Sequence, residues 1–128
     1  MTSLTPDAPV HRLAAAIETT ELSVRELVEG ALDRIAGRDA TLNAFTLVLH
    51  ESARQTADRA DADIKAGRYR GPLHGIPISI KDLIDVAGVP TTAASHVTDR
   101  SPARDDAPVV SRLRDAGAIL IGKCNLHE

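Results

Sequence analysis

The stretch that decides how this chain folds is Ile76-Pro-Ile-Ser-Ile-Lys81. Its side chains alternate, which is the pattern of a β-strand with two different faces. Isoleucine alone forms one side, at positions 76, 78 and 80, whereas Pro77, Ser79 and Lys81 form the other. Turn-forming residues precede this strand, so Lys81 is predicted to stand at the carboxyl end of a core strand.

A second strand is predicted at residues 118–121, where four consecutive apolar residues indicate burial on both faces. The segment before it begins at residues 105–108 with two aspartates and a proline, an acidic cap followed by a first-turn proline. It continues as an amphipathic helix up to Gly117. A strand, a helix and a strand in that order predict a right-handed βαβ crossover. Residues 91–103 show no sustained period and are predicted to be an ordered loop.

The strongest local pattern in the first half of the chain is a helix that begins after Ser23. Ser23 and Glu26 have the spacing of a capping box, in which each side chain satisfies a backbone N–H of the first turn. Apolar residues then recur at helical spacing as far as Ile35, and Gly37 is the predicted stop.

Two weaker patterns, at residues 10–17 and 51–66, predict a further helix on each side of the strong one. Residues 45–49 are compatible with a strand or with the entry to the later helix. The prediction is therefore an α/β chain that forms one partial domain, residues 1–128. Residues 8–69 are expected to be mainly helical, and residues 70–128 to run strand, loop, helix, strand.

Composition excludes several classes of function. The 15 basic and 18 acidic residues leave a net charge of −3 without a block of like charge, which argues against a nucleic-acid or membrane partner. Cys124 is the single cysteine, so no internal disulfide forms. The first residues lack the basic and apolar regions of a secretory signal, and a cytoplasmic location is expected.

Residues 117–124 have the Gly-x4-Gly-Lys spacing of a phosphate-binding loop, but Cys124 stands where that motif has a serine or threonine. The intervening Ala-Ile-Leu-Ile is itself the predicted strand, so its amides belong to a sheet ladder and do not face a phosphate. Cys124 and His127 have metal-ligand spacing, but no second pair of ligands follows. No metal and no cofactor are predicted.

Lys81 is the residue whose position carries chemical meaning. A lysine that ends a core strand either reaches solvent or is partly desolvated, and desolvation favours the neutral amine that acts as a general base. Most lysines at strand ends simply reach water. Strand parity sends Asp82 to the opposite side, where it is expected to cap the following turn.

Three segments carry a family resemblance. Residues 71–92 read Gly-Pro-Leu-His-Gly-Ile-Pro-Ile-Ser-Ile-Lys-Asp-Leu-Ile-Asp-Val-Ala-Gly-Val-Pro-Thr-Thr, residues 106–118 read Asp-Ala-Pro-Val-Val-Ser-Arg-Leu-Arg-Asp-Ala-Gly-Ala, and residues 121–128 read Ile-Gly-Lys-Cys-Asn-Leu-His-Glu. Together they closely resemble the N-terminal part of amidase-signature hydrolases. The resemblance extends back through residues 22–28 and 42–45. Two positions depart from it, because Ala94 stands where the family commonly has glycine and Cys124 where it commonly has threonine.

The resemblance implies the N-terminal part of an α/β/α sandwich with a mixed sheet. It also implies amide hydrolysis through an acyl-enzyme by a Ser–cis-Ser–Lys triad, whose lysine maps onto Lys81 and whose oxyanion is held by a glycine-rich loop. In such enzymes both serines lie in a Gly/Ser-rich signature beyond the Asn-Leu-His-Glu segment, and the present sequence ends at Glu128. The 128 residues alone are therefore expected to be inactive.

The expected partners are a small-molecule amide and the missing C-terminal part of the same domain, and a homodimer stays open. The family includes aliphatic and aryl amidases, fatty-acid amide hydrolases, ureide-type hydrolases and the tRNA-dependent amidotransferase, through its A subunit. The alternatives are therefore a fragment of that amidotransferase chain or a non-catalytic module.

Overall fold

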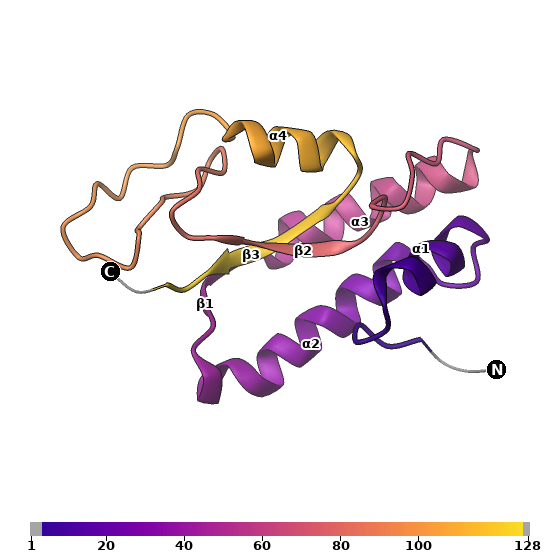
Figure 1. Cartoon of the computed structure of the whole chain (residues 1–128), viewed down its shortest axis with the longest axis horizontal. Helices are drawn as coiled ribbons and strands as arrows, with labels where there is room; N and C mark the ends of the chain where they lie inside the picture. The colour runs from indigo at the N-terminus through magenta and orange to yellow at the C-terminus, as the bar shows by residue number, and fades with distance from the viewer. Residues whose placement is uncertain (1–3, 127–128) are drawn as a thin grey trace.

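The computed structural model describes residues 4–126, which form a three-stranded sheet with helices on both of its faces (Figure 1). No helix within these residues is both long and apolar enough to cross a membrane. The elements are, in chain order, α1 (Val10–Glu18), α2 (Val24–Leu42), β1 (Phe45–Val48), α3 (His50–Lys65), β2 (Pro77–Lys81), α4 (Pro108–Asp115) and β3 (Ile119–Cys124).

The sheet is mixed and has the strand order β1-β3-β2. Strand β3 lies in the centre, parallel to β2 and antiparallel to β1. The ambiguous residues 45–49 thus form a strand that leads into α3. The parallel pairing of β2 and β3, joined through α4, agrees with the predicted βαβ unit, and the mixed α/β class is confirmed. β3 reaches Cys124, three residues further than predicted.

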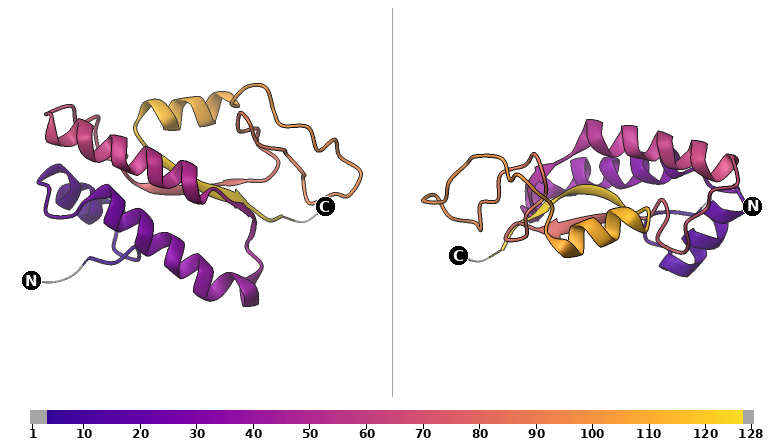
Figure 2. Two further views of the ribbon diagram at one scale, coloured as in Figure 1. Left: turned by 180° about the vertical axis from the view of Figure 1, so that it is seen from behind. Right: turned by 90° about the horizontal axis from the view of Figure 1, so that it is seen from above.

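Helices lie on both faces of the sheet (Figure 2), and an apolar cluster on each face holds the layers together. The larger cluster joins α1, α2 and α3 to the sheet through Ile76, Ile119 and Ile121. The smaller one lies beneath α4 and contains Ile80, while Ile78 packs against both clusters. The three isoleucines of residues 76–80 therefore do not line one common core, contrary to prediction. The pairing of β2 with β3 shifts register after Ile78, and such a bulge adds local twist.

Helix α2 begins as predicted and ends later than predicted. The Ser23 hydroxyl oxygen accepts a hydrogen bond from the Glu26 N–H at 3.0 Å. The helix runs past Gly37 to Leu42, so the predicted stop at Gly37 is wrong. A glycine inside a helix costs only about 1 kcal/mol relative to alanine, which by itself is too little to end the helix. The chain leaves the helix at Asn43, whose left-handed backbone (φ 49°) and N–H bond to the Asp39 carbonyl close the last turn.

Helix α4 lacks the predicted acidic cap. Its N-cap residue is Ala107, which makes no side-chain cap bond, and Pro108 occupies the first turn as predicted. Asp106 instead accepts a hydrogen bond from the Ala87 N–H at 2.8 Å and pairs with Arg114 at 2.8 Å. The carboxylate is thus used to join the loop after β2 to α4, and not to cap the helix.

The turn that enters β3 depends on a glycine. Gly117 has φ +90°, and a Cβ there would lie 2.5 Å from Cδ2 of the buried His74. Gly117 also accepts a backbone hydrogen bond from the Gly75 N–H at 2.9 Å. Gly67 has a similar φ of +83° but nothing within 4 Å of its Cβ position. A comparison of alanine substitutions at these two glycines therefore distinguishes the cost of backbone strain from the cost of steric overlap.

We expect Gly117→Ala to lower the free energy of unfolding by about 2–5 kcal/mol, since about 1–2 kcal/mol arises from the left-handed backbone and about 1–3 kcal/mol from overpacking. Gly67→Ala carries the backbone cost alone and should lose about 1–2 kcal/mol. Urea unfolding of both variants measures the difference. Equal losses would contradict the packing of Gly117 against His74.

Candidate active site

Lys81 ends β2 and lies opposite Cys124 of β3 in the parallel pairing. Its side chain is exposed, as is that of Ser79 two residues earlier, in agreement with their predicted common side. Of the two environments considered for this lysine, the structure shows the solvent-exposed one. An exposed amine at the carboxyl edge of a parallel pair is open to an approaching group.

Asp82 does not cap the following turn, and that prediction is wrong. Its side chain is only 1% exposed and faces a cluster of donors from distant segments. One carboxylate oxygen accepts a hydrogen bond from the Thr46 hydroxyl at 2.9 Å, and the same oxygen accepts one from the Thr92 hydroxyl. The other oxygen lies 3.1 Å from Nζ of Lys123 and accepts a bond from the Thr92 N–H at 3.3 Å. Asp82 therefore joins β1, β3 and the loop after β2.

Lys123 is the cation of this cluster and is also only 1% exposed. Besides its ion pair with Asp82, its ammonium donates hydrogen bonds to the Ile84 carbonyl at 2.9 Å and the Thr91 hydroxyl at 3.3 Å. Lys123 stands in the segment that imitates a phosphate-binding loop, and the interpretation of that segment as a strand is confirmed. Its ammonium faces a carboxylate and two neutral acceptors of the same chain.

The pairing of Asp82 with Lys123 is a feature of the structure that the sequence did not predict. Lys123 lies two residues beyond the predicted strand 118–121, so its burial, and with it the need for an opposite charge nearby, became visible only because β3 extends to Cys124. Asp82 directly follows the neighbouring strand and would have been the natural candidate. What hid the pair was the assumption that Asp82 acts locally.

The environment of Asp82 stabilises its ionised form. Burial by itself favours the protonated acid, but hydrogen bonds from Thr92, Lys123 and Thr46 outweigh it and hold the pKa of the carboxyl below its ordinary value. The ionised Asp82 carboxyl therefore faces Nζ of Lys123 in a site nearly closed to water.

The loop after β2 is fixed to the same aspartate. The Ala93 N–H donates to the Asp82 carbonyl at 2.7 Å, and the Ser95 N–H donates to the Thr92 carbonyl at 2.9 Å. Ala93 and Ala94 both adopt left-handed backbone conformations, with φ of 50° and 57°. Such a conformation costs a non-glycine residue about 1–2 kcal/mol, which explains physically why glycine is suited to position 94. The surrounding bonds hold this loop despite that cost.

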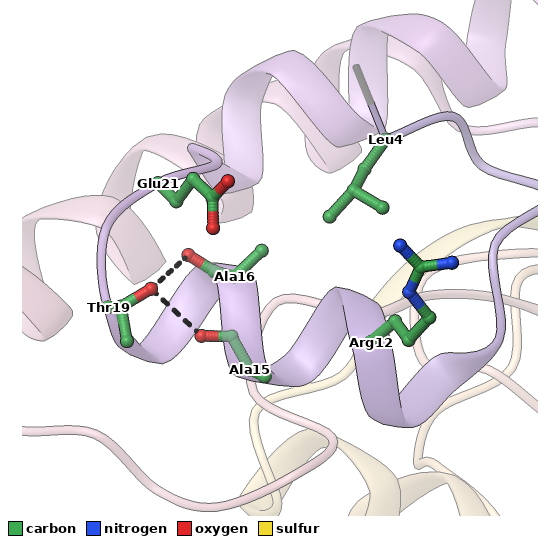
Figure 3. A pocket seen from close by; sticks show the side chains of 6 residues that line it. All are labelled: Leu4, Arg12, Ala15, Ala16, Thr19 and Glu21. Atoms are coloured by element: carbon green, nitrogen blue, oxygen red, sulfur yellow. Dashed lines mark hydrogen bonds between the residues drawn. The ribbon is translucent and has the colours of Figure 1, made fainter. Parts of the chain in front are cut away.

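Two other features do not make a site. A hollow beside α1 is lined by Leu4, Arg12, Ala15, Ala16, Thr19 and Glu21 (Figure 3). It lies at the side of the sheet where β2 begins, far from the loop that follows β2 (Figure 1), and its charged residues are exposed. The second feature is His74, whose Nδ1 accepts a bond from the Arg70 N–H at 3.0 Å. Burial and the Arg70 charge lower the pKa of His74, as expected for a neutral packing residue.

Metal-ligating side chains do not gather in the described part of the chain. Residues 4–126 contain no group of three or more histidine, cysteine, aspartate or glutamate side chains that could hold a metal ion. Cys124 is a free, half-buried thiol. His127, the other member of the metal-like spacing noted in the sequence, lies outside the described residues.

Comparison with known proteins adds the family. The family model Amidase matches residues 26–128. An amidase of Pseudomonas putida is 41% identical over all 128 residues, which correspond to 27% of that protein. The A subunit of the glutamyl-tRNA(Gln) amidotransferase of Azoarcus sp. (strain BH72) is 46% identical over 122 residues, 95% of this chain and 25% of that one. The solved native peptide amidase of Stenotrophomonas maltophilia matches with a TM-score of 0.87 at 40% identity, over 94% of this chain and 25% of that one.

The molecule is placed in the amidase-signature class of α/β proteins by its helices, its mixed sheet and strand β2, which ends at Lys81. The chain belongs to the amidase family. It spans about a quarter of the length of the curated relatives that it matches.

We expect Lys123→Met to lower the free energy of unfolding by about 3–5 kcal/mol, because it leaves the Asp82 carboxylate buried without its cation. The double variant Asp82→Leu/Lys123→Met removes both charges and should lose less than the sum of the single changes, with a coupling of about 1–3 kcal/mol. Lys81→Met, at an exposed lysine next to the cluster, is the control and should change stability by less than about 0.5 kcal/mol. Strictly additive losses in urea unfolding would refute the ion pair.

Proposed function

We propose that this chain supplies the lysine of a Ser–cis-Ser–Lys triad in an amide hydrolase, with Lys81 as the general base. The observation that carries the proposal is the position of Lys81. It lies in the segment matched to the amidase family, at the carboxyl end of β2, with its side chain exposed. An exposed amine at this edge is accessible to a serine from a segment outside residues 4–126.

The proposed reaction is amide plus water giving carboxylate plus ammonia or an amine. The Lys81 amine takes a proton from the bridging serine, which in turn takes one from the nucleophilic serine. The nucleophile attacks the amide carbonyl, and the developing oxyanion is held by backbone N–H groups of a glycine-rich loop. The amine leaves with a proton, and water then hydrolyses the acyl-enzyme.

The serines of this triad are not among those of the present sequence. No Gly-Gly-Ser-Ser-Gly-Gly-like run occurs in it. Ser79 is the serine nearest to Lys81 along the chain, but both belong to one extended strand, which offers no converging N–H groups for an oxyanion. We therefore propose that the 128 residues alone do not turn over amides, and that the remainder of the domain is the partner that completes the site.

A specific observation supports a second candidate. The amidotransferase chain from Azoarcus is 46% identical to this chain, which is no less than the 41% identity of the Pseudomonas amidase. Under this alternative the same lysine would serve an amidotransferase that works with a partner protein and tRNA. Under the hydrolase proposal the substrate is a small amide and no nucleic acid takes part. A cytoplasmic location is proposed for either candidate, because Cys124 is a free thiol and a reducing compartment keeps such a thiol reduced.

A chimera tests the role of Lys81. Residues 1–128 replace the aligned segment of the Pseudomonas putida amidase, so that the serine signature comes from that enzyme. We expect the chimera to hydrolyse amides and Lys81→Met to lower kcat by about 10²- to 10⁴-fold, the range for loss of a general base. Lys65→Met removes another exposed lysine, at the end of α3, and should leave kcat unchanged.

The outcomes separate the candidates. Amide turnover by the chimera that survives Lys81→Met would overturn the role of this lysine, and turnover by the 128-residue chain alone would overturn the need for external serines. Residues 1–128 are also placed in the Azoarcus amidotransferase A subunit, and glutamine hydrolysis by that chimera together with inactivity of the Pseudomonas chimera would favour the second candidate.

A further inference from the structure

We propose that Asp82 and Lys123 are positioning residues, which fix the direction in which the neighbouring Lys81 amine points. This inference rests on the proposed role of Lys81 as the base. Adjacent residues of an extended strand point to opposite sides. If the Asp82 side chain is held on one side of the strand, the direction in which the Lys81 side chain leaves the backbone on the opposite side is fixed as well.

Every polar group of Asp82, both in the backbone and in the side chain, has a bonding partner in the structure. Its N–H donates to the Cys124 carbonyl at 2.9 Å, and its carbonyl accepts from the Ala93 N–H at 2.7 Å. Both carboxylate oxygens are also bound, by Lys123 and by the hydroxyls of Thr46 and Thr92. The peptide that joins Lys81 to Asp82 is consequently restrained from three separate segments.

Lys81 is itself an exposed, flexible side chain, and a base that transfers a proton needs a defined starting point. The restraint on Asp82 fixes the backbone from which the Lys81 side chain extends. A second restraint acts on Lys81 itself, because its carbonyl accepts a hydrogen bond from the Ile84 N–H at 3.0 Å and so closes the turn that follows. The carbonyl of that same Ile84 accepts from Lys123. One cation thus fixes both the residue after Lys81 and the turn that follows.

A buried ion pair is weak evidence for stability, since apolar residues of similar volume often stabilise a core as well or better. An apolar pair, however, would leave the Thr92 hydroxyl without its acceptor and the Thr46 hydroxyl with only the Lys123 carbonyl, 3.3 Å away, and would not set a unique orientation. The geometry of this cluster is therefore better explained by a role in orienting Lys81 than by a contribution to the stability of the fold.

The test uses the chimera that carries residues 1–128. Thr92→Val removes one hydroxyl bond to Asp82 without leaving a charge unpaired, and we expect kcat to fall about tenfold with KM within about twofold, because a misplaced base affects the chemical step. Thr92→Ser keeps the hydroxyl and should restore kcat. Thr56→Val is the matched control, since Thr56 also donates its hydroxyl, to the Ser52 carbonyl of α3, but lies outside the cluster.

Asp82→Asn and Lys123→Arg extend the series, with melting temperatures measured on every variant and kcat measured well below them. Loss of stability in Thr92→Val and Asp82→Asn at unchanged kcat would overturn the positioning role while leaving the function of Lys81 intact. Retention of activity by Lys81→Met would overturn both. A fall in kcat that Thr92→Ser reverses supports the proposal.

Discussion

The buried contact between Asp82 and Lys123 is the interaction on which the carboxyl edge of the sheet depends. Two opposite charges lie 3.1 Å apart, each only 1% exposed. Burial of either charge alone would be costly, so each requires the other. Because Lys123 belongs to the central strand and Asp82 directly follows the neighbouring one, the pair forms only when β2 and β3 are correctly aligned. It thereby links the strand register to the conformation of the loop that follows.

The loop after β2 shows the consequence. It contains two alanines in left-handed conformations, Ala93 and Ala94, which an isolated loop would avoid. They persist because Thr92 and Ala93 are bonded to Asp82 and because Asp106 connects the loop to α4. The strain is thus held by contacts made elsewhere, an arrangement common where a fold positions a functional group. In this chain the loop begins directly after Lys81, the proposed general base.

Local sequence patterns were sufficient for most elements, and long-range contacts account for what they missed. The N-cap at Ser23, which is one half of the predicted capping box, and the isoleucine strand depend on neighbours in the sequence and could be predicted. The local signals at Gly37 and Asp106 were misleading: a single glycine is too weak to end a helix, and Asp106 is bound to Ala87 and Arg114 instead of capping α4. The pair of Asp82 with Lys123 requires knowledge of the strand register, which neither segment contains alone. The exposure of Lys81 similarly follows from the sheet arrangement, while its role was suggested by family resemblance.

The most direct test of this account is the exchange of lysine ammonium protons with water, measured by ¹H–¹⁵N NMR on the lysine-labelled 128-residue chain. The chain has three lysines, Lys65, Lys81 and Lys123, so the signals can be assigned by single substitutions. The account predicts one slowly exchanging ammonium, absent from Lys123→Met and present in Lys81→Met. Rapid exchange of all three ammonium groups in the folded chain would contradict it.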